Sequence, residues 1–132
     1  TPLSSSAASD VYKRQMKPQS AKQKGRLLQQ WFRTLLMDLL GLANTDIVSR
    51  PMGSRGEDLI IGDESRKLFP YSIECKNQEA VNVWKSYEQA KYNSNEYEPL
   101  LVIKRNRVLP LVVVDAKHFV GLIKRLNEYE KQ

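Results

Sequence analysis

The chain has almost none of the residues that build disulfides or zinc sites. Its 132 residues include one cysteine, Cys75, and one histidine, His118. A single cysteine cannot form an intramolecular disulfide, and one cysteine with one histidine cannot supply the four ligands of a structural zinc site. These absences exclude a disulfide-stabilised domain and a zinc-binding fold, and they favour a reducing, cytoplasmic setting.

Long apolar runs are also missing. The most apolar segment, LLMDLLGLA, is interrupted by Asp38 and is far shorter than the roughly 20 residues that span a bilayer. No membrane helix is therefore expected. Acidic residues are fewer than basic ones, 15 against 21, which gives a net charge of +6 and a pI near 9.5. An anionic partner, most commonly nucleic acid, fits this charge, although a simple soluble basic protein has it too.

The first fifteen residues, TPLSSSAASDVYKRQ, are small and polar and show no apolar periodicity. They precede a methionine and resemble translated adapter sequence, so we expect residues 1–15 to be a non-native or disordered leader. Residues 16–132 are expected to form a single domain. Because the leader carries one net positive charge, the domain alone keeps +5, and the basic character belongs to it.

Hydrophobic periodicity predicts an α/β protein. A basic lead-in at 16–25 is followed by a helix at 26–41, strands at 46–51, 57–62 and 69–76, a helix at 79–94, two paired strands at 98–107 and 108–115, and a helix from 115. Residues 63–68 are expected to be a loop. We predict one mixed central sheet flanked by helices, with central character for both late strands and core positions for Trp31 and Trp84, unless Trp84 serves a partner surface.

Three charged residues fall on predicted strands, where burial makes charge costly. Asp58 precedes the apolar run LII, and Glu74 and Lys76 lie two apart within YSIECK. Side chains alternate along a strand, so Glu74 and Lys76 share one face while Cys75 points to the other, into the core. Glu74 and Lys76 could form a structural ion pair. Alternatively, Asp58 and Glu74 could hold a divalent cation with Lys76 beside it, since carboxylate oxygens suit Mg²⁺ and a neighbouring lysine can orient water.

The second alternative resembles a known pattern. Asp58, a gap of fifteen residues and then Glu74-Cys75-Lys76 resemble the PD-(D/E)xK nuclease signature, and the order of elements is similar to that superfamily's restriction-endonuclease-like core. The proline that usually precedes the aspartate is absent, because GED stands there. Within the superfamily the chain is most similar to small phage-type and Holliday-junction-resolvase-like nucleases.

The resemblance implies roles for further residues. Asp58, Glu74 and the backbone carbonyl of Cys75 would bind Mg²⁺, with Mn²⁺ able to substitute. Lys76 would position the attacking water. Gln29 stands where relatives often carry a glutamate, so it would complete the metal site or orient a water. Glu57 is the rival of Asp58 as ligand, and Gln78 and Gln89 are secondary candidates near the site.

Basic residues outside the motif are candidates for phosphate contacts, which would make binding depend on salt. They lie at the start of the first helix, around the glycine-rich turn before Asp58, and in the turn between the last two strands. The three residues of the last turn could equally form a solvated turn. The set is Lys24, Arg26, Arg50, Arg55, Lys104, Arg105 and Arg107.

The sequence therefore predicts a Mg²⁺-dependent deoxyribonuclease. The family implies products with 5′-phosphate and 3′-hydroxyl ends, an endonuclease acting on branched, phage or recombination DNA, and a homodimer as in resolvases. One alternative is a catalytically silent nucleic-acid-binding module on the same fold, because Gln29 replaces an acid. Another is a basic phage structural protein that neither cuts DNA nor binds it.

Overall fold

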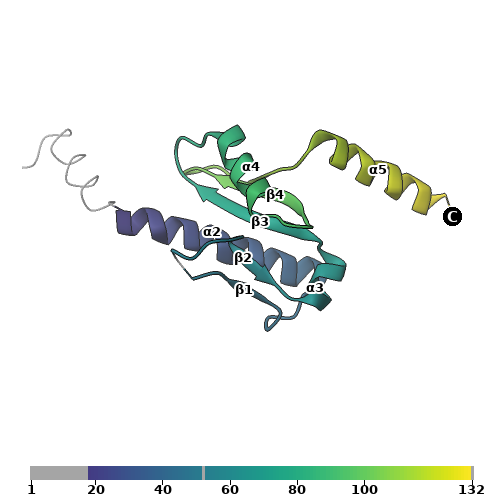
Figure 1. The fold of residues 1–132 in the computed structure, drawn as a ribbon, viewed down its shortest axis with the longest axis horizontal. Coiled ribbons are helices and arrows are strands. Elements are labelled where there is room, and N and C mark those ends of the chain that lie inside the picture. Colours follow the sequence, from purple (N-terminus) through teal and green to yellow (C-terminus); the bar gives the residue numbers. More distant parts are fainter. Residues whose placement is uncertain (1–17, 52, 132) are drawn as a thin grey trace, which may run out of the picture.

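A computed structural model describes residues 18–51 and 53–131, so the leader predicted at 1–15 lies outside the described residues. Helices and strands alternate along this part of the chain, as expected for the α/β class (Figure 1). The elements are α2 (Pro18–Leu40), β1 (Ile47–Ser49), β2 (Leu59–Ile61), α3 (Asp63–Leu68), β3 (Tyr71–Asn77), α4 (Val83–Tyr92), β4 (Glu98–Lys104), β5 (Leu111–Val113) and α5 (Ala116–Glu130).

The first helix is longer than its apolar stripe. The helix was predicted at residues 26–41, after a basic lead-in at 16–25, but α2 begins at Pro18. Proline is tolerated in the first helical turn, where its missing N–H has no partner to lose. The helix ends where predicted: Gly41 adopts a φ of 72° and its N–H donates to the Met37 carbonyl at 3.0 Å. Glycine takes this left-handed conformation without strain.

The strands form two hydrogen-bonded sheets, which corrects the expectation of one continuous sheet. β1 pairs antiparallel with β2, whereas β3 pairs parallel with β4, and β4 pairs antiparallel with β5. The two sheets meet before β2, where the Asp58 N–H donates to the Ile73 carbonyl at 2.9 Å. Beyond this contact β2 and β3 belong to different sheets, and a cavity lies beside β3. The specific restriction-endonuclease-like core stays a prediction.

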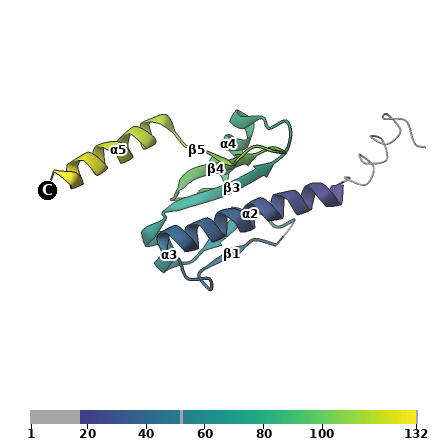
Figure 2. The same ribbon diagram turned by 180° about the vertical axis from the view of Figure 1, so that it is seen from behind.

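Helices α2 and α4 lie on opposite faces of the β3–β4 pair (Figures 1 and 2). The predicted alternation along β3 is confirmed on the α2 face, where Ile73 and Cys75 are buried in the main apolar cluster. On the other face, Ala90 of α4 is buried. Residues 79–82 were predicted to be helical but precede α4, whose N-cap is Asn82. The cluster on the α2 face contains Leu28, Phe32, Leu36, Leu42, Ile47, Leu59, Ile61, Ile73, Cys75, Leu100 and Val102.

A helix replaces the loop predicted at residues 63–68. Asp63 and Glu64 open α3, and Arg66 and Lys67 close it, so its charges complement the helix dipole. The carboxylate of Asp46, a residue that precedes β1, accepts a hydrogen bond from the N–H of Ser65 in α3 at 2.8 Å. Hydrogen bonding from the Ser65 side chain, and then from this N–H, lowers the pKa of Asp46. The short polar run gave no apolar periodicity, which is why the sequence did not predict the helix.

The C-terminal elements are more exposed than predicted. Leu111 and Val112 of β5 are 59% and 49% exposed, so β5 is an edge strand and not a central one. Helix α5 has the predicted Asp115 N-cap, but none of its residues is buried. It projects away from the sheets (Figures 1 and 2). Within the described residues, no helix is both long and apolar enough to cross a membrane.

Candidate active site

The candidate site lies beside β3, next to the loop that leads to β2. A cavity of about 280 Å³ opens there, between the N-terminal half of α2, the loop before β2, the middle of β3 and helix α4. The structure thus brings together residues that are far apart in the sequence, from Ala21 to Gln89. The predicted site residues that line the cavity are Gln29, Arg50, Asp58, Glu74, Cys75, Lys76, Gln78 and Gln89.

Asp58 is held by the backbone on both sides. Its N–H donates to the Ile73 carbonyl, and its carboxylate Oδ2 accepts the Cys75 N–H at 2.6 Å. These two bonds hold Asp58 against β3, and Asp58 lines the cavity. Burial raises the pKa of Asp58, while the Cys75 N–H and the charges of Lys76 and Arg50 lower it. The carboxylate is therefore fixed in position before any ligand binds.

Glu74 is the most unusual group in the described residues. It is 4% exposed, and its Oε2 is the one buried side-chain oxygen or nitrogen of the described residues that has no hydrogen-bond partner. Burial, followed by repulsion from Asp58, raises the pKa of Glu74 to about 7, against the lowering effects of Lys76 and Asn93. A buried carboxylate oxygen without a partner is costly unless another group satisfies it.

The position of Lys76 is compatible with both interpretations of the Glu74–Lys76 pair, a structural ion pair and a lysine beside a metal site. The ion pair, however, leaves part of Glu74 unsatisfied. The Nζ of Lys76 lies 3.6 Å from Glu74 Oε1, as a structural ion pair requires. That contact leaves Oε2 unsatisfied and does not offset the repulsion between Glu74 and Asp58. The ion pair alone therefore does not account for the site, whereas a cation between the two carboxylates would.

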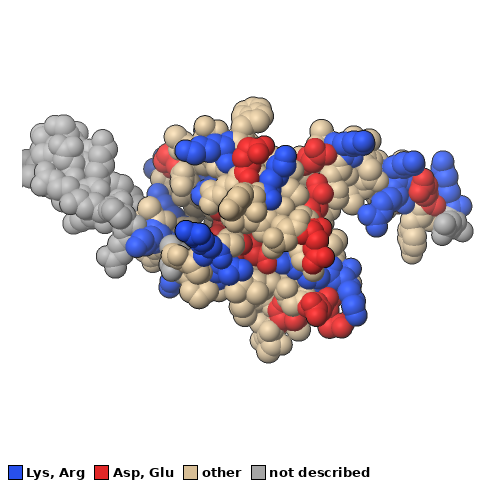
Figure 3. All heavy atoms as spheres, viewed as in Figure 1, with Lys and Arg blue, Asp and Glu red and all other residues tan. Residues whose placement is uncertain are grey.

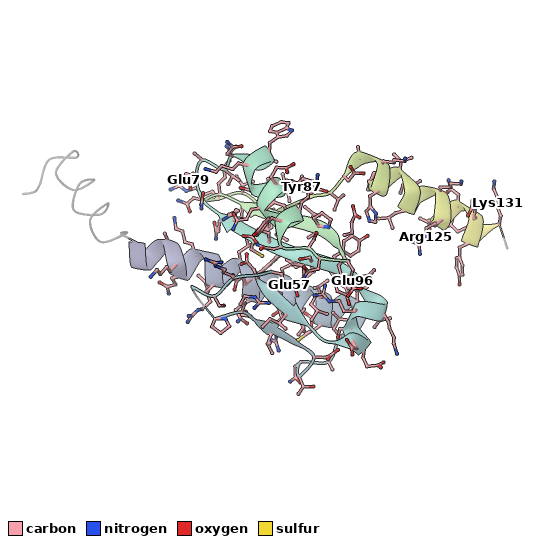
Figure 4. The ribbon with its side chains drawn as sticks, viewed as in Figure 1. Glu57, Glu79, Tyr87, Glu96, Arg125 and Lys131 are labelled. Carbon is pink, nitrogen blue, oxygen red and sulfur yellow. The ribbon has the colours of Figure 1, made fainter. Side chains whose placement is uncertain are left out.

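Glu57, the rival ligand, belongs to a different cluster. Its Oε1 accepts from Arg66, a residue only 8% exposed on α3, and it is not among the residues that line the cavity (Figure 4 labels Glu57). Arg66 also donates to the Tyr71 carbonyl and stacks over the Tyr97 ring at 3.9 Å. The structure thus assigns Asp58 to the cavity and Glu57 to the packing of α3.

The glutamines differ in burial. Gln29 lies on the cavity side of α2 and is 7% exposed, so it is not the solvated residue typical of a helix surface. Gln78 and Gln89 are exposed at the rim. Asn93, which ends α4, was missed by sequence reasoning although it acts on the pKa of Glu74. Its position as a helix C-cap gave no chemical signal.

The basic residues divide into two groups. Arg50 lines the cavity and donates to the Glu57 carbonyl at 2.6 Å, and Lys22, a residue of the basic lead-in, also lines it. Lys104 and Arg105 line a second, more apolar cavity of about 240 Å³ and do not reach the first.

The turn after β4 is nevertheless tied to α2, because Lys24 Nζ donates to Asn106 Oδ1 at 3.0 Å. The Asn106 N–H in turn donates to Glu79, which Figure 4 labels at this end of the molecule. In Figure 3, Lys and Arg side chains gather where α2 begins, around the cavity end of the molecule. Arg26, Arg55 and Arg107 are exposed.

The donor set fits a hard divalent cation that keeps water ligands. Within the described ranges, no cluster of three or more His, Cys, Asp or Glu side chains is arranged to hold a metal ion. Two carboxylates, however, converge on the cavity beside the Cys75 backbone, and Glu74 Oε2 lacks a partner there. Mg²⁺ is commonly bound by one or two carboxylates with the remaining positions filled by water or phosphate. The residues present therefore suit Mg²⁺ or Mn²⁺ and do not suit zinc.

Comparisons with protein-family models, with curated proteins and with solved structures found no match to this chain. The class of site therefore rests on its geometry alone. The carboxylates of Asp58 and Glu74 lie with Lys76 along one cavity at the β3 edge of the parallel β3–β4 pair.

Proposed function

We propose that the protein is a Mg²⁺-dependent deoxyribonuclease with a PD-(D/E)xK-type centre, acting in the cytoplasm. One observation carries the proposal: Glu74, whose Oε2 is buried without a hydrogen-bond partner, lines the same cavity as Asp58. Two carboxylates in one site repel each other unless a cation or a proton lies between them. A nuclease centre requires a cation at this place. A structural ion pair or a packing role for Glu74 would not require one.

Each residue around the cavity then has a chemical role. Asp58, Glu74 and the Cys75 carbonyl hold the cation, which supplies positive charge to stabilise the phosphate during hydrolysis. Lys76 orients the attacking water by hydrogen bonding and offsets charge on the attacked phosphate. Gln29, buried at the cavity wall, accepts from or donates to a water and so holds its position.

DNA is the substrate that we propose. The net charge of +6 and the basic residues around the cavity provide contacts to a phosphate backbone. By resemblance, hydrolysis leaves 5′-phosphate and 3′-hydroxyl ends, and branched DNA is the preferred substrate.

Binding of DNA is expected to weaken with salt, and Arg55→Ala and Arg105→Ala each remove one exposed phosphate-contacting charge. Each variant should reduce the slope of log K against log salt by about 0.9 for duplex DNA. Fluorescence anisotropy in EDTA at several salt concentrations measures this slope without cleavage. Lys67→Ala, which removes an exposed lysine on α3, is the matched control and should leave the slope unchanged. If wild type and the three variants have equal slopes, neither arginine contacts the DNA.

The proposed activity is tested by incubating the protein with supercoiled, linear, single-stranded and four-way-junction DNA in Mg²⁺, Mn²⁺ or EDTA. We expect cleavage with either metal, none in EDTA, and the fastest cutting on the junction. Gln29 in place of an acid supports a second candidate, a DNA-binding module without activity. Salt-sensitive binding with no cleavage of any substrate would establish that candidate, and neither binding nor cleavage would contradict both.

A further inference from the structure

A second cavity, of about 240 Å³, lies where strands β3 and β4 end. Its walls are mostly apolar, unlike those of the candidate active site. Leu109 and Leu111 are 81% and 59% exposed, so the cavity is open to solvent on the side of β5. Exposed apolar side chains that gather in a hollow with polar residues at its edge typically mark a binding site. The apolar lining residues are Val81, Val83, Ile103, Val108, Leu109 and Leu111.

The second cavity adjoins the candidate active site. Gln78 lines both cavities, and its N–H donates to the Lys104 carbonyl at 3.0 Å. In the register of the sheet, Lys76 lies opposite Ile103, and Ile103 lies opposite Leu111. These three side chains therefore share one face of the sheet. Since neighbouring strands lie about 4.8 Å apart, the row runs from the candidate active site to the second cavity over about 10 Å.

Charged and polar side chains form the edge of the second cavity. Lys104, the last residue of β4, and Arg105, which follows it, are among its lining residues. Glu79 lines it too, and its Oε1 accepts the Asn106 N–H at 2.8 Å (Figure 4 labels Glu79). Gln78 adds an amide that both donates and accepts hydrogen bonds. The cavity thus suits a ligand with an apolar body, a polar edge and an attached anionic group.

Hydrogen bonds to α2 fix the second cavity relative to the candidate active site. Lys24 Nζ donates to Asn106 Oδ1 at 3.0 Å, in the turn between β4 and β5. The Asn77 side chain, at the end of β3, donates to the Lys24 carbonyl at 2.9 Å. The turn that carries Arg105, the end of β3 and the N-terminal half of α2 are therefore linked, and one ligand can extend over both cavities.

We propose that the second cavity binds one unpaired nucleobase of the DNA substrate, one or a few nucleotides from the bond that is cut. Lys104 and Arg105 contact the neighbouring phosphates. A nucleobase has apolar faces and a polar edge and is attached to a phosphate, so it matches the lining of this cavity. The volume lies below the range of about 300–1,000 Å³ that is typical of drug-sized ligands, and it suits a single base.

The proposal rests on the proposed function and specifies its substrate. A base in a duplex is paired and stacked and must be flipped out before it can enter a cavity, which costs free energy. A base in a single strand, or at the branch of a junction, is free to enter. The enzyme should therefore act on DNA with an unpaired base beside the cut.

The test is binding in EDTA, where no cleavage is expected, measured by fluorescence anisotropy at one salt concentration. The ligands are oligothymidine, a strand of equal length whose nucleotides all lack bases, and a duplex. The two single strands carry the same number of phosphates, so the ratio of their Kd values reports contacts to the bases. Wild type should bind oligothymidine about tenfold more tightly than the abasic strand.

Leu111→Ser and Leu109→Ser remove apolar surface from the cavity without changing charge. Each should lower the ratio of Kd values about threefold to fivefold and leave binding of the abasic strand and the duplex unchanged. Leu68→Ser is the matched control, because Leu68 lies on α3, is 58% exposed and lines neither cavity. It should keep the wild-type ratio. Both cavity variants change exposed residues, and circular dichroism verifies their folding.

A wild-type ratio in both cavity variants would overturn the proposal and leave the cavity to a ligand other than DNA. An equal loss of affinity for the abasic strand and the duplex would also overturn it, because the lost contact would then be to the backbone. Failure of the proposed function is seen separately. If wild type cuts no DNA in Mg²⁺ but both variants lower the ratio, the base-binding cavity stands and the nuclease activity does not.

Discussion

Asp58→Asn is expected to lower the rate of DNA cleavage about a thousandfold, while Glu57→Gln leaves the rate within a few fold of wild type. The two acids are neighbours in sequence, but only Asp58 lines the cavity with Glu74. The amide substitution preserves shape and removes the charge that the cation requires, and loss of one such electrostatic contact typically costs two to three orders of magnitude in rate. Cleavage rates of a junction or plasmid substrate at saturating Mg²⁺ measure the difference.

Glu57→Gln also controls for stability. It weakens the ion pair with Arg66, so it should lower the free energy of unfolding more than Asp58→Asn does. A less stable variant that still cuts, beside a stable variant that does not, separates catalysis from folding. If both variants cut equally well, or if Glu57→Gln is the inactive one, the assignment of Asp58 to the metal is wrong.

Without metal, the protein should lose stability as pH rises, and Glu74 is the cause. The pKa of its carboxyl is raised from 4.5 to about 7 in the folded protein. The folded state therefore holds a proton that the unfolded state has already released between these values. Stability from this group is complete below about pH 4.5 and is lost as pH rises to about 7, by on the order of 3 kcal/mol.

Urea unfolding in EDTA at pH 5 and pH 8 measures this change. Glu74→Gln should abolish most of it and should be more stable than wild type at pH 8, because it removes an ionised carboxylate from a buried site. Glu88→Gln, at an exposed position on α4, is the matched control and should behave as wild type. Mg²⁺ should restore stability to wild type at pH 8 but not to Glu74→Gln. An unchanged pH dependence in Glu74→Gln would show that another group causes it.

The sequence predicted those parts of the fold and the site that follow from periodicity. Alternation along YSIECK placed Cys75 in the core and Glu74 on the opposite face, and both positions are confirmed. The β4–β5 pairing and the Asp115 N-cap are also confirmed. Both could be predicted because strand alternation and helix capping depend on residues close in sequence. Proximity of Asp58 to Glu74 was also predicted, but it arises from the hydrogen bonds of Asp58 to Ile73 and Cys75 just before β2, because β2 and β3 belong to different sheets.

The features that sequence reasoning missed depend on tertiary contacts. α3 is a short polar helix, buried on one side through Arg66 and backed by Asp46, and neither contact leaves a periodic signal. Trp31 and Trp84 were predicted to be core residues because they are large and apolar, yet both are exposed.

The most direct test compares single-turnover cleavage by wild type and Lys76→Ala, side by side in Mg²⁺ and in EDTA. Lys76 lines the cavity and its Nζ lies 3.6 Å from Glu74 Oε1, but in the proposed centre it is not one of the groups that would hold the cation. Wild type should cut DNA only with metal, and Lys76→Ala should bind DNA equally well and cut it about a hundredfold to ten thousandfold more slowly. Cleavage by Lys76→Ala at the wild-type rate, or cleavage by either protein in EDTA, would contradict the proposed centre.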